Sequence, residues 1–298
     1  MLSRRAAITA PLFGLLPALR GASPTMTVSI HQTTSRDAGY RKMLEGWAKA
    51  GIRQVELTDS VLEPFLKTED LNAARRVLTD NGLTPVSSTS PLPDVWITGP
   101  ARPASLDTWK KRCEQFASLG LTKIYCPSIT NRKVTAEDYK STPECIREAA
   151  EIARQHSLTA MIEFTRSSTH LATLPTALNM LRAANHPNAK LLFDFYHFYS
   201  GLSKLEDLDL LKPGELGHVH FQDTPDMPRE LLDSTTRLIP GDGIAPIEKI
   251  LRKLAEKGYA GPLSVELFAP EFQKADPFEL AKQIKQKCEA QMSKAGVA

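Results

Sequence analysis

The chain has 298 residues, of which 42% are hydrophobic, and this is enough to bury a sizeable core. The formal net charge is only +3 and no dense run of Lys and Arg occurs, which argues against a nucleic-acid partner. The four cysteines show no Cys-x-x-Cys pair and no close spacing, which argues against a disulfide framework.

The first 24 residues have the layout of an export signal. Arg4 and Arg5 precede an apolar stretch over 6–19, and small residues follow it. The paired arginines resemble a Tat-type signal, and the apolar stretch is too short for a comfortable transmembrane helix. We therefore predict a Tat-type leader over residues 1–24, an exported or periplasmic protein and no stable membrane anchor. The alternative is a cytoplasmic protein with an irregular leader.

After the leader, short apolar runs rich in Val and Ile alternate with longer stretches of helical period. The short runs predict strands at 27–32, 54–59, 85–90, 123–128, 159–164, 190–195, 217–222 and 263–268. The stretches between them predict helices at 39–51, 68–82, 105–120, 135–157, 173–186, 245–258 and 276–292, with a weak and short one near 203–212. The second of these helices is expected to begin with a Thr cap at its first residue.

Alternating strands and helices predict parallel strands with right-handed crossovers. Eight such units between residues 25 and 298 favour an α/β protein with a single-domain (β/α)₈ barrel over an open doubly wound sheet. A Rossmann-type dinucleotide site is not indicated, because no Gly-x-Gly-x-x-Gly follows the first strand and "PGDG" at 240–243 comes only after the seventh.

Such a barrel carries its chemistry at the carboxyl ends of the strands. Four titratable residues end otherwise apolar strands there, namely Glu163, Asp194, His220 and Glu266 on the fifth to eighth strands. Burying three neighbouring carboxylates is prohibitive unless a cation compensates. Three carboxylates and one imidazole suit Mn²⁺, Mg²⁺ or Co²⁺, and zinc is possible but less favoured. We predict that one divalent ion binds here, with Mn²⁺ as the first choice. Taken alone, each of these residues could instead form a salt bridge at the rim of the barrel.

Three further polar residues receive other interpretations. His218 shares a strand face with His220 and is interpreted as a core or supporting histidine below the site. Glu56 is interpreted first as a rim salt bridge and second as a substrate contact. His31 is a minor candidate for the pocket wall.

These residues resemble the xylose isomerase-like TIM barrels, the sugar phosphate isomerase/epimerase superfamily. The resemblance covers the whole chain after the leader, and its specificity lies mostly in the second half. It rests on the ordered motifs "MIEF", "FDFYH", "HVHFQD", "RLIPGDG" and "GYAGPLSVEL". It implies that Glu163, Asp194, His220 and Glu266 are metal ligands, that Glu163 and Glu266 are also the acid–base pair, and that His197 and Arg237 hold substrate oxygens.

The implied reaction is isomerisation or epimerisation of a keto-sugar or polyol through a cis-enediolate. A chelated metal acidifies the C–H beside a carbonyl, one glutamate removes the proton, and the other returns it to the opposite face or the neighbouring carbon. Expulsion of a β-substituent from the same enediolate gives the alternative, a lyase or dehydratase of an inosose or keto-glycoside. A binding protein with a degenerate site is disfavoured, because all four ligand positions hold competent residues.

The chain departs from one branch of this family. Endonuclease IV carries extra histidines after strands three and four and an Asp-x-His after strand seven, whereas the corresponding segments here read "SSTSP", "YCPS" and "STTRLIPG". The sequence therefore predicts a small sugar or polyol as substrate and no nucleic acid. It leaves the identity of that substrate and the oligomeric state open.

Overall fold

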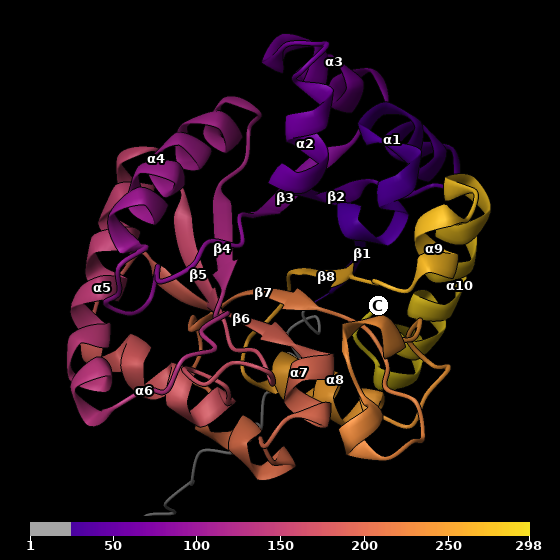
Figure 1. Ribbon diagram of the computed structural model, residues 1–298. Helices are drawn as coiled ribbons and strands as arrows, with labels where there is room; N and C mark the ends of the chain where they lie inside the picture. The colour runs from indigo at the N-terminus through magenta and orange to yellow at the C-terminus, as the bar shows by residue number, and fades with distance from the viewer. Residues whose placement is uncertain (1–24) are drawn as a thin grey trace, which may run out of the picture.

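Eight parallel strands close into a barrel in chain order in the computed structural model, which describes residues 25–298 (Figure 1). Each strand pairs with the next, and β8 pairs with β1 to close the barrel. The strands are β1 Thr27–His31, β2 Gln54–Thr58, β3 Thr84–Thr89, β4 Lys123–Pro127, β5 Thr159–Glu163, β6 Ala189–Asp194, β7 Leu216–His220 and β8 Pro262–Val265. The predicted (β/α)₈ barrel is thereby confirmed, as is each of the eight strands. The leader predicted over 1–24 lies outside the described residues.

Helices surround the barrel and cover the outer faces of its strands (Figure 1). They are α1 Tyr40–Lys49, α2 Asp59–Phe65, α3 Leu71–Asp80, α4 Arg102–Ser118, α5 Ala136–Gln155, α6 Leu174–Ala184, α7 Phe195–Ser200, α8 Ile247–Glu256, α9 Pro270–Lys274 and α10 Pro277–Ala295. Four 3₁₀ segments accompany them: η1 Gln32–Ala38, η2 Leu205–Leu210, η3 Arg229–Leu231 and η4 Ser234–Thr236. Within the described chain, no helix is both long and apolar enough to span a membrane.

Two expectations about helices are corrected. The helix predicted over 68–82 begins at Leu71, because the carboxylate of Asp70 accepts the N–H of Ala73 at 2.7 Å and caps it in place of the expected threonine. The segment near 203–212 forms the 3₁₀ turn η2 and no α-helix. Helices α2, α7 and α9 were not predicted, since five to seven residues are too few to show a helical period.

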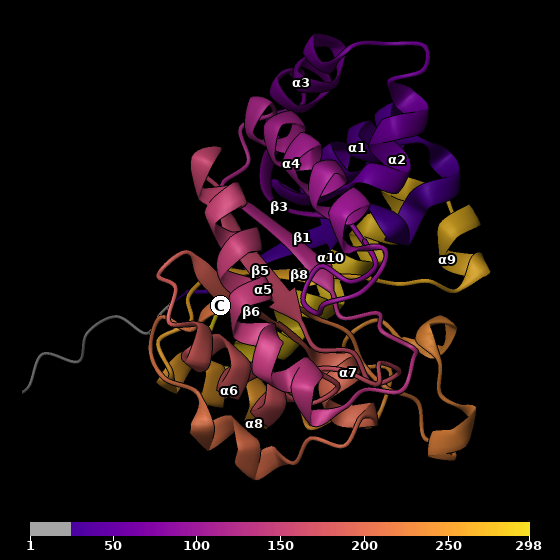
Figure 2. The ribbon, with the colours of Figure 1, turned by 60° about the vertical axis from the view of Figure 1, so that its left-hand side comes forward.

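The main apolar core lies between the strands and the surrounding helices, whereas a small separate cluster of Tyr125, Met161 and Leu192 fills part of the barrel interior. Successive strand residues point to opposite faces, so the inward positions are set by the two-residue period. Several inward positions carry fully buried polar side chains, among them Glu56, His218 and Ser264. The interior is therefore partly polar. Helices α7 and α9 and the connection after β7 lie at the end of the barrel where the strands finish (Figure 2).

Candidate metal centre

The structure brings together the four residues that the sequence predicts as metal ligands. Glu163, Asp194 and His220 are the last residues of β5, β6 and β7, and Glu266 directly follows β8. One donor atom from each lies within 4.8 Å of the others, and all four side chains are buried. The Nδ1 atom of His220 lies 3.0 Å from Oε1 of Glu163 and 3.4 Å from one oxygen each of Asp194 and Glu266.

The pKa values of these groups reflect burial and the charges that they exert on one another. Burial raises the pKa of Glu163 to about 8, and the charges of Asp194 and Glu266 add to this rise while His220 opposes it. Burial also acts to raise the pKa of Glu266, but His220 and Arg237 outweigh it and lower this pKa to about 2. Burial would lower the pKa of His220, yet the surrounding acids hold it well above its usual value.

The donor set fits a divalent cation. Three carboxylates and one imidazole nitrogen converge in a buried place, where their mutual repulsion is relieved by positive charge. These are the ligands of hard or borderline ions such as Mn²⁺, Mg²⁺ and Co²⁺, and zinc accepts the same donors. Glu163, Asp194, His220 and Glu266 would hold the ion.

Arg237 lies at the edge of this cluster, directly after η4. Its Nη1 atom donates to Oδ2 of Asp194 at 3.0 Å and to Oε2 of Glu266 at 2.5 Å. The guanidinium lies over two aromatic rings, with its carbon 5.2 Å from the centre of Tyr196 and 4.9 Å from that of Phe268. Ion pairing in its plane and stacking on its faces fix this side chain as a rigid cation beside the carboxylates.

His197 also lies at the site, and Asp194 positions it. Oδ1 of Asp194 caps α7 by accepting the N–H of His197 at 2.6 Å, while its Oδ2 accepts Nε2 of Gln222 at 2.6 Å. Burial lowers the pKa of His197 to about 4, so the ring is neutral at pH 7 and its Nε2 atom can accept from Arg237 at 3.0 Å. Sequence reasoning missed Gln222. The one local feature that could have indicated it is its position, two residues after the last residue of β7.

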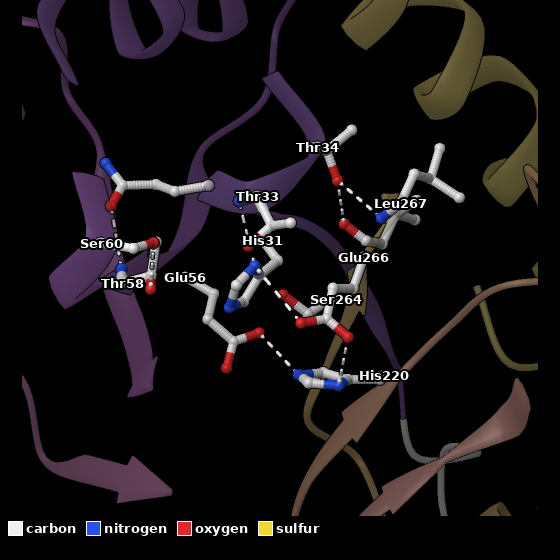
Figure 3. Close-up of polar contacts among 12 residues, drawn as sticks. His31, Thr33, Thr34, Glu56, Thr58, Ser60, His220, Ser264, Glu266 and Leu267 are labelled. Carbon is white, nitrogen blue, oxygen red and sulfur yellow. Dashed lines mark hydrogen bonds and ion pairs between the residues drawn. The ribbon is translucent and has the colours of Figure 1, made fainter. Parts of the chain in front are cut away.

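Glu56 is not a rim salt bridge, and the first interpretation of it was wrong. It lies in the middle of β2, points into the barrel and is fully buried. Its Oε2 atom is 3.1 Å from Nε2 of His218 and 3.2 Å from Nε2 of His220, the second contact being drawn in Figure 3. Burial alone would raise its pKa, but the two imidazoles outweigh burial and hold it well below its usual value. His218 is a fully buried neighbour of His220, as predicted.

A pocket of about 350 Å³ lies at this cluster and is lined by two of the four candidate ligands, Glu163 and Glu266. This volume is near the lower end for small-molecule sites and suits a ligand of monosaccharide size. Much of its lining consists of hydroxyl-bearing side chains from several strand ends. These are Thr33, Thr58, Ser60, Thr89, Tyr125, Thr165, Ser167 and Ser234.

His31 and Tyr125 form one wall of this pocket. Nδ1 of His31 accepts the N–H of Thr33 at 3.1 Å, so the ring proton of the neutral form lies on Nε2, which is 3.4 Å from the Tyr125 hydroxyl. That hydroxyl in turn donates to Oε1 of Glu266 at 3.4 Å. The minor candidacy of His31 for the pocket wall thus agrees with the structure. Sequence reasoning missed Tyr125, because a tyrosine inside a strand reads as core filling.

The loop after β7 places Arg237 and is held by Asp223. The carboxylate of Asp223 is 1% exposed and accepts four backbone N–H groups at 2.8 to 3.0 Å. The backbone of Asp223 also pairs with that of Leu238, next to Arg237. The four N–H groups belong to Thr224, Gly241, Gly243 and Ala245.

Residues 44–291 match the family model described as xylose isomerase-like TIM barrel. The chain belongs to this family. Within it, the chain is 30% identical to an inosose isomerase of Bacillus velezensis over 192 residues, which cover 63% of this chain and 69% of that protein. It is 26% identical to an inosose isomerase of Halalkalibacterium halodurans over 85% of this chain and 91% of that protein.

Two further similarities widen the comparison. A 3-dehydroshikimate dehydratase of Bacillus anthracis is 34% identical over 119 residues, covering 38% of this chain and 42% of that protein. Among solved structures, the IOLI protein with a bound zinc atom superposes with a TM-score of 0.84 at 23% identity, over 91% of this chain and 99% of that chain. This structural likeness shows the shared barrel fold.

Proposed function

We propose that this protein is a divalent-metal-dependent isomerase or epimerase acting on a keto-sugar or polyol. The observation that carries the proposal is the buried convergence of Glu163, Asp194, His220 and Glu266. Two of them, Glu163 and Glu266, line a pocket rich in hydroxyl-bearing side chains. The family and the relatives named inosose isomerase support the reaction class. Mn²⁺ is our first choice of ion, because the donor set is dominated by carboxylate oxygens.

A divalent cation bound by the four ligands would supply Lewis acidity, which makes the C–H beside a carbonyl more acidic. Glu163 on β5 and Glu266 after β8 reach the site from strands separated by two others. One carboxylate can take a proton from a substrate carbon, and the other can deliver one to the opposite face or to the neighbouring carbon. The first outcome is epimerisation and the second is isomerisation.

The other side chains would orient the substrate and stabilise charge. The guanidinium of Arg237 is fixed beside Glu266 and can donate to an oxygen on which negative charge develops, as in an enediolate. His197 is held by Arg237 and the cap of α7, which suits it to orient one hydroxyl. A pocket that hydrogen-bonds several hydroxyl groups discriminates against ligands that lack them, which favours a polyol or sugar.

The test combines metal analysis with a substrate screen. Protein purified with Mn²⁺ present is analysed for bound metal, and keto-sugars and inososes are incubated with it in D₂O and followed by NMR. We expect one divalent ion per chain and deuterium on a carbon next to a carbonyl, both lost in Asp194→Ala. Glu163→Gln and Glu266→Gln should abolish exchange, whereas Glu271→Gln in α9 should not. The proposal would be overturned if the protein bound no metal and none of the compounds tested took up deuterium.

A lyase is the second candidate. The dehydratase among the relatives favours it, and the Tyr125 hydroxyl beside Glu266 places a further proton donor at the pocket wall. After removal of the α-proton, such a donor can protonate a departing β-hydroxyl, which leaves as water and yields an unsaturated carbonyl compound. The same NMR screen separates the two, since a lyase product loses water and absorbs in the near ultraviolet.

We also propose that residues 1–24 act as a Tat-type export leader. The paired Arg4 and Arg5 before an apolar stretch support this. Cell fractionation of the full chain and of an Arg4→Lys/Arg5→Lys variant tests it. Accumulation of the wild type in the cytoplasm, with no difference from the variant, would refute export.

A further inference from the structure

We propose that Glu56 is a positioning residue that holds the imidazole of His220 with its Nδ1 atom toward the metal. This rests on the metal site of the proposed function and adds to it a residue from the opposite part of the barrel. Figure 3 shows the arrangement, with the His220 ring between Glu56 on one side and Glu266 on the other.

The two nitrogen atoms of His220 face different surroundings. Nδ1 faces the carboxylates and lies 3.0 Å from Oε1 of Glu163. A neutral imidazole has one proton, so Nδ1 can bind a cation only when the proton lies on Nε2. Nε2 is buried and has no hydrogen bond of standard geometry within residues 25–298, while Oε2 of Glu56 lies 3.2 Å from it. Glu56 is therefore the group that can attract this proton to Nε2.

Glu56 is itself held in place. Its Oε2 atom also lies 3.1 Å from Nε2 of His218, on the same strand as His220, so one oxygen serves both rings. The faces and edges of the His220 ring are packed by other rings, with centroid distances of 5.7 Å to His31 and 5.1 Å to Tyr125. Packing restricts the tilt of the imidazole, and the carboxylate sets which nitrogen carries the proton.

Such a carboxylate next to a metal-binding histidine fixes its tautomer and increases its basicity, and its removal typically weakens metal binding about 10- to 100-fold. A purely structural alternative is that Glu56 only balances His218 in the barrel interior. That role would change the free energy of unfolding but leave the metal affinity of the folded protein unchanged.

The experiment measures Zn²⁺ and Mn²⁺ affinity of the purified full chain by competition with a chelator, alongside urea unfolding of the metal-free protein. We expect Glu56→Gln to weaken binding about 10- to 100-fold. The matched control is Asp59→Asn, which alters another buried carboxylate, paired with Ser90 and Arg112, and should leave the affinity unchanged. In a His220→Asn background, Glu56→Gln should have no further effect, since its action passes through that ring.

The Co²⁺-loaded protein gives a second readout, because a change in the tilt or basicity of His220 shifts its visible absorption. ¹⁵N NMR of histidine-labelled, zinc-loaded wild type needs no variant and should show Nε2 protonated on the ring whose Nδ1 responds to zinc. Wild-type affinity in Glu56→Gln, or a zinc-bound Nε2, would overturn the positioning role. Failure of the wild type itself to bind metal would instead overturn the proposed function.

Discussion

Asp223→Asn tests how the loop that carries Arg237 is held. One oxygen of the Asp223 carboxylate accepts the N–H groups of Thr224 and Ala245, and the other accepts those of Gly241 and Gly243. An asparagine keeps only one of these oxygens. Two N–H groups then lose their acceptor, whichever way the amide is turned, and they face an amide donor instead.

The magnitude follows from these four bonds. A hydrogen bond to a charged acceptor contributes about 1.5 to 3 kcal/mol, so the loss of two amounts to about 3 to 6 kcal/mol if the loop stays in place. Movement of the loop toward solvent restores some bonds to water, and we expect a decrease of about 3 kcal/mol in the free energy of unfolding. Catalysis should fall as well, because Arg237 loses its fixed place.

Urea unfolding followed by tryptophan fluorescence measures this decrease. The comparison holds when wild type and variant show the same slope of unfolding free energy against urea concentration. The control is Asp242→Asn in the same loop, where an exposed carboxylate pairs with Lys287 and contributes at most about 1 kcal/mol. Gly243→Ala should act in the same direction as Asp223→Asn, because its added Cβ would overlap the carbonyl oxygen of Thr224. A loss in Asp223→Asn no greater than in the control would refute the reasoning.

Further predictions concern pH, charge and metal binding. Burial lowers the pKa of His170 from 6.5 to about 4, so its neutral form stabilises the fold above about pH 6.5 and this contribution is lost as the pH falls toward 4. When the pH is lowered from 7.5 to 4.5, the free energy of unfolding should therefore decrease by about 2 to 3 kcal/mol less in His170→Gln than in the wild type. Urea unfolding at the two pH values measures this, and equal decreases would contradict it. Arg237→Lys keeps the charge but loses the planar guanidinium that contacts Asp194, Glu266 and His197. Turnover should therefore fall about 10²- to 10³-fold while the metal content stays unchanged. Wild-type turnover in this variant would count against the role of Arg237. Metal binding should release protons and weaken as the pH falls, since protons compete with the metal for the ligands. Calorimetry in buffers of different ionisation enthalpy checks this, because released protons bind to the buffer and change the observed heat. Identical heats in all buffers would contradict the prediction.

The sequence determined the barrel because its period is local. The run before Asp194 is apolar and ends in a polar residue, and similar runs recur eight times with helical stretches between them. Parallel strands joined by helices can only close or stay open, and eight units favour closure. Since all eight carboxyl ends then meet at one rim, the positions of Glu163, His220 and Glu266 at the ends of their strands were enough to predict that they lie together.

Only the tertiary structure decided what lies beneath and beside these residues. Glu56 on β2 meets His220 on β7 across the barrel, and no spacing along the chain encodes that contact. Tyr125 reaches Glu266 in the same way, and Asp223 gathers N–H groups up to 22 positions away through the path of one loop. A strand pattern tells which side chains point inward, but the depth at which they meet depends on the stagger between strands that closure imposes. For that reason the sequence identified the candidate ligands, while the structure revealed the groups that orient them.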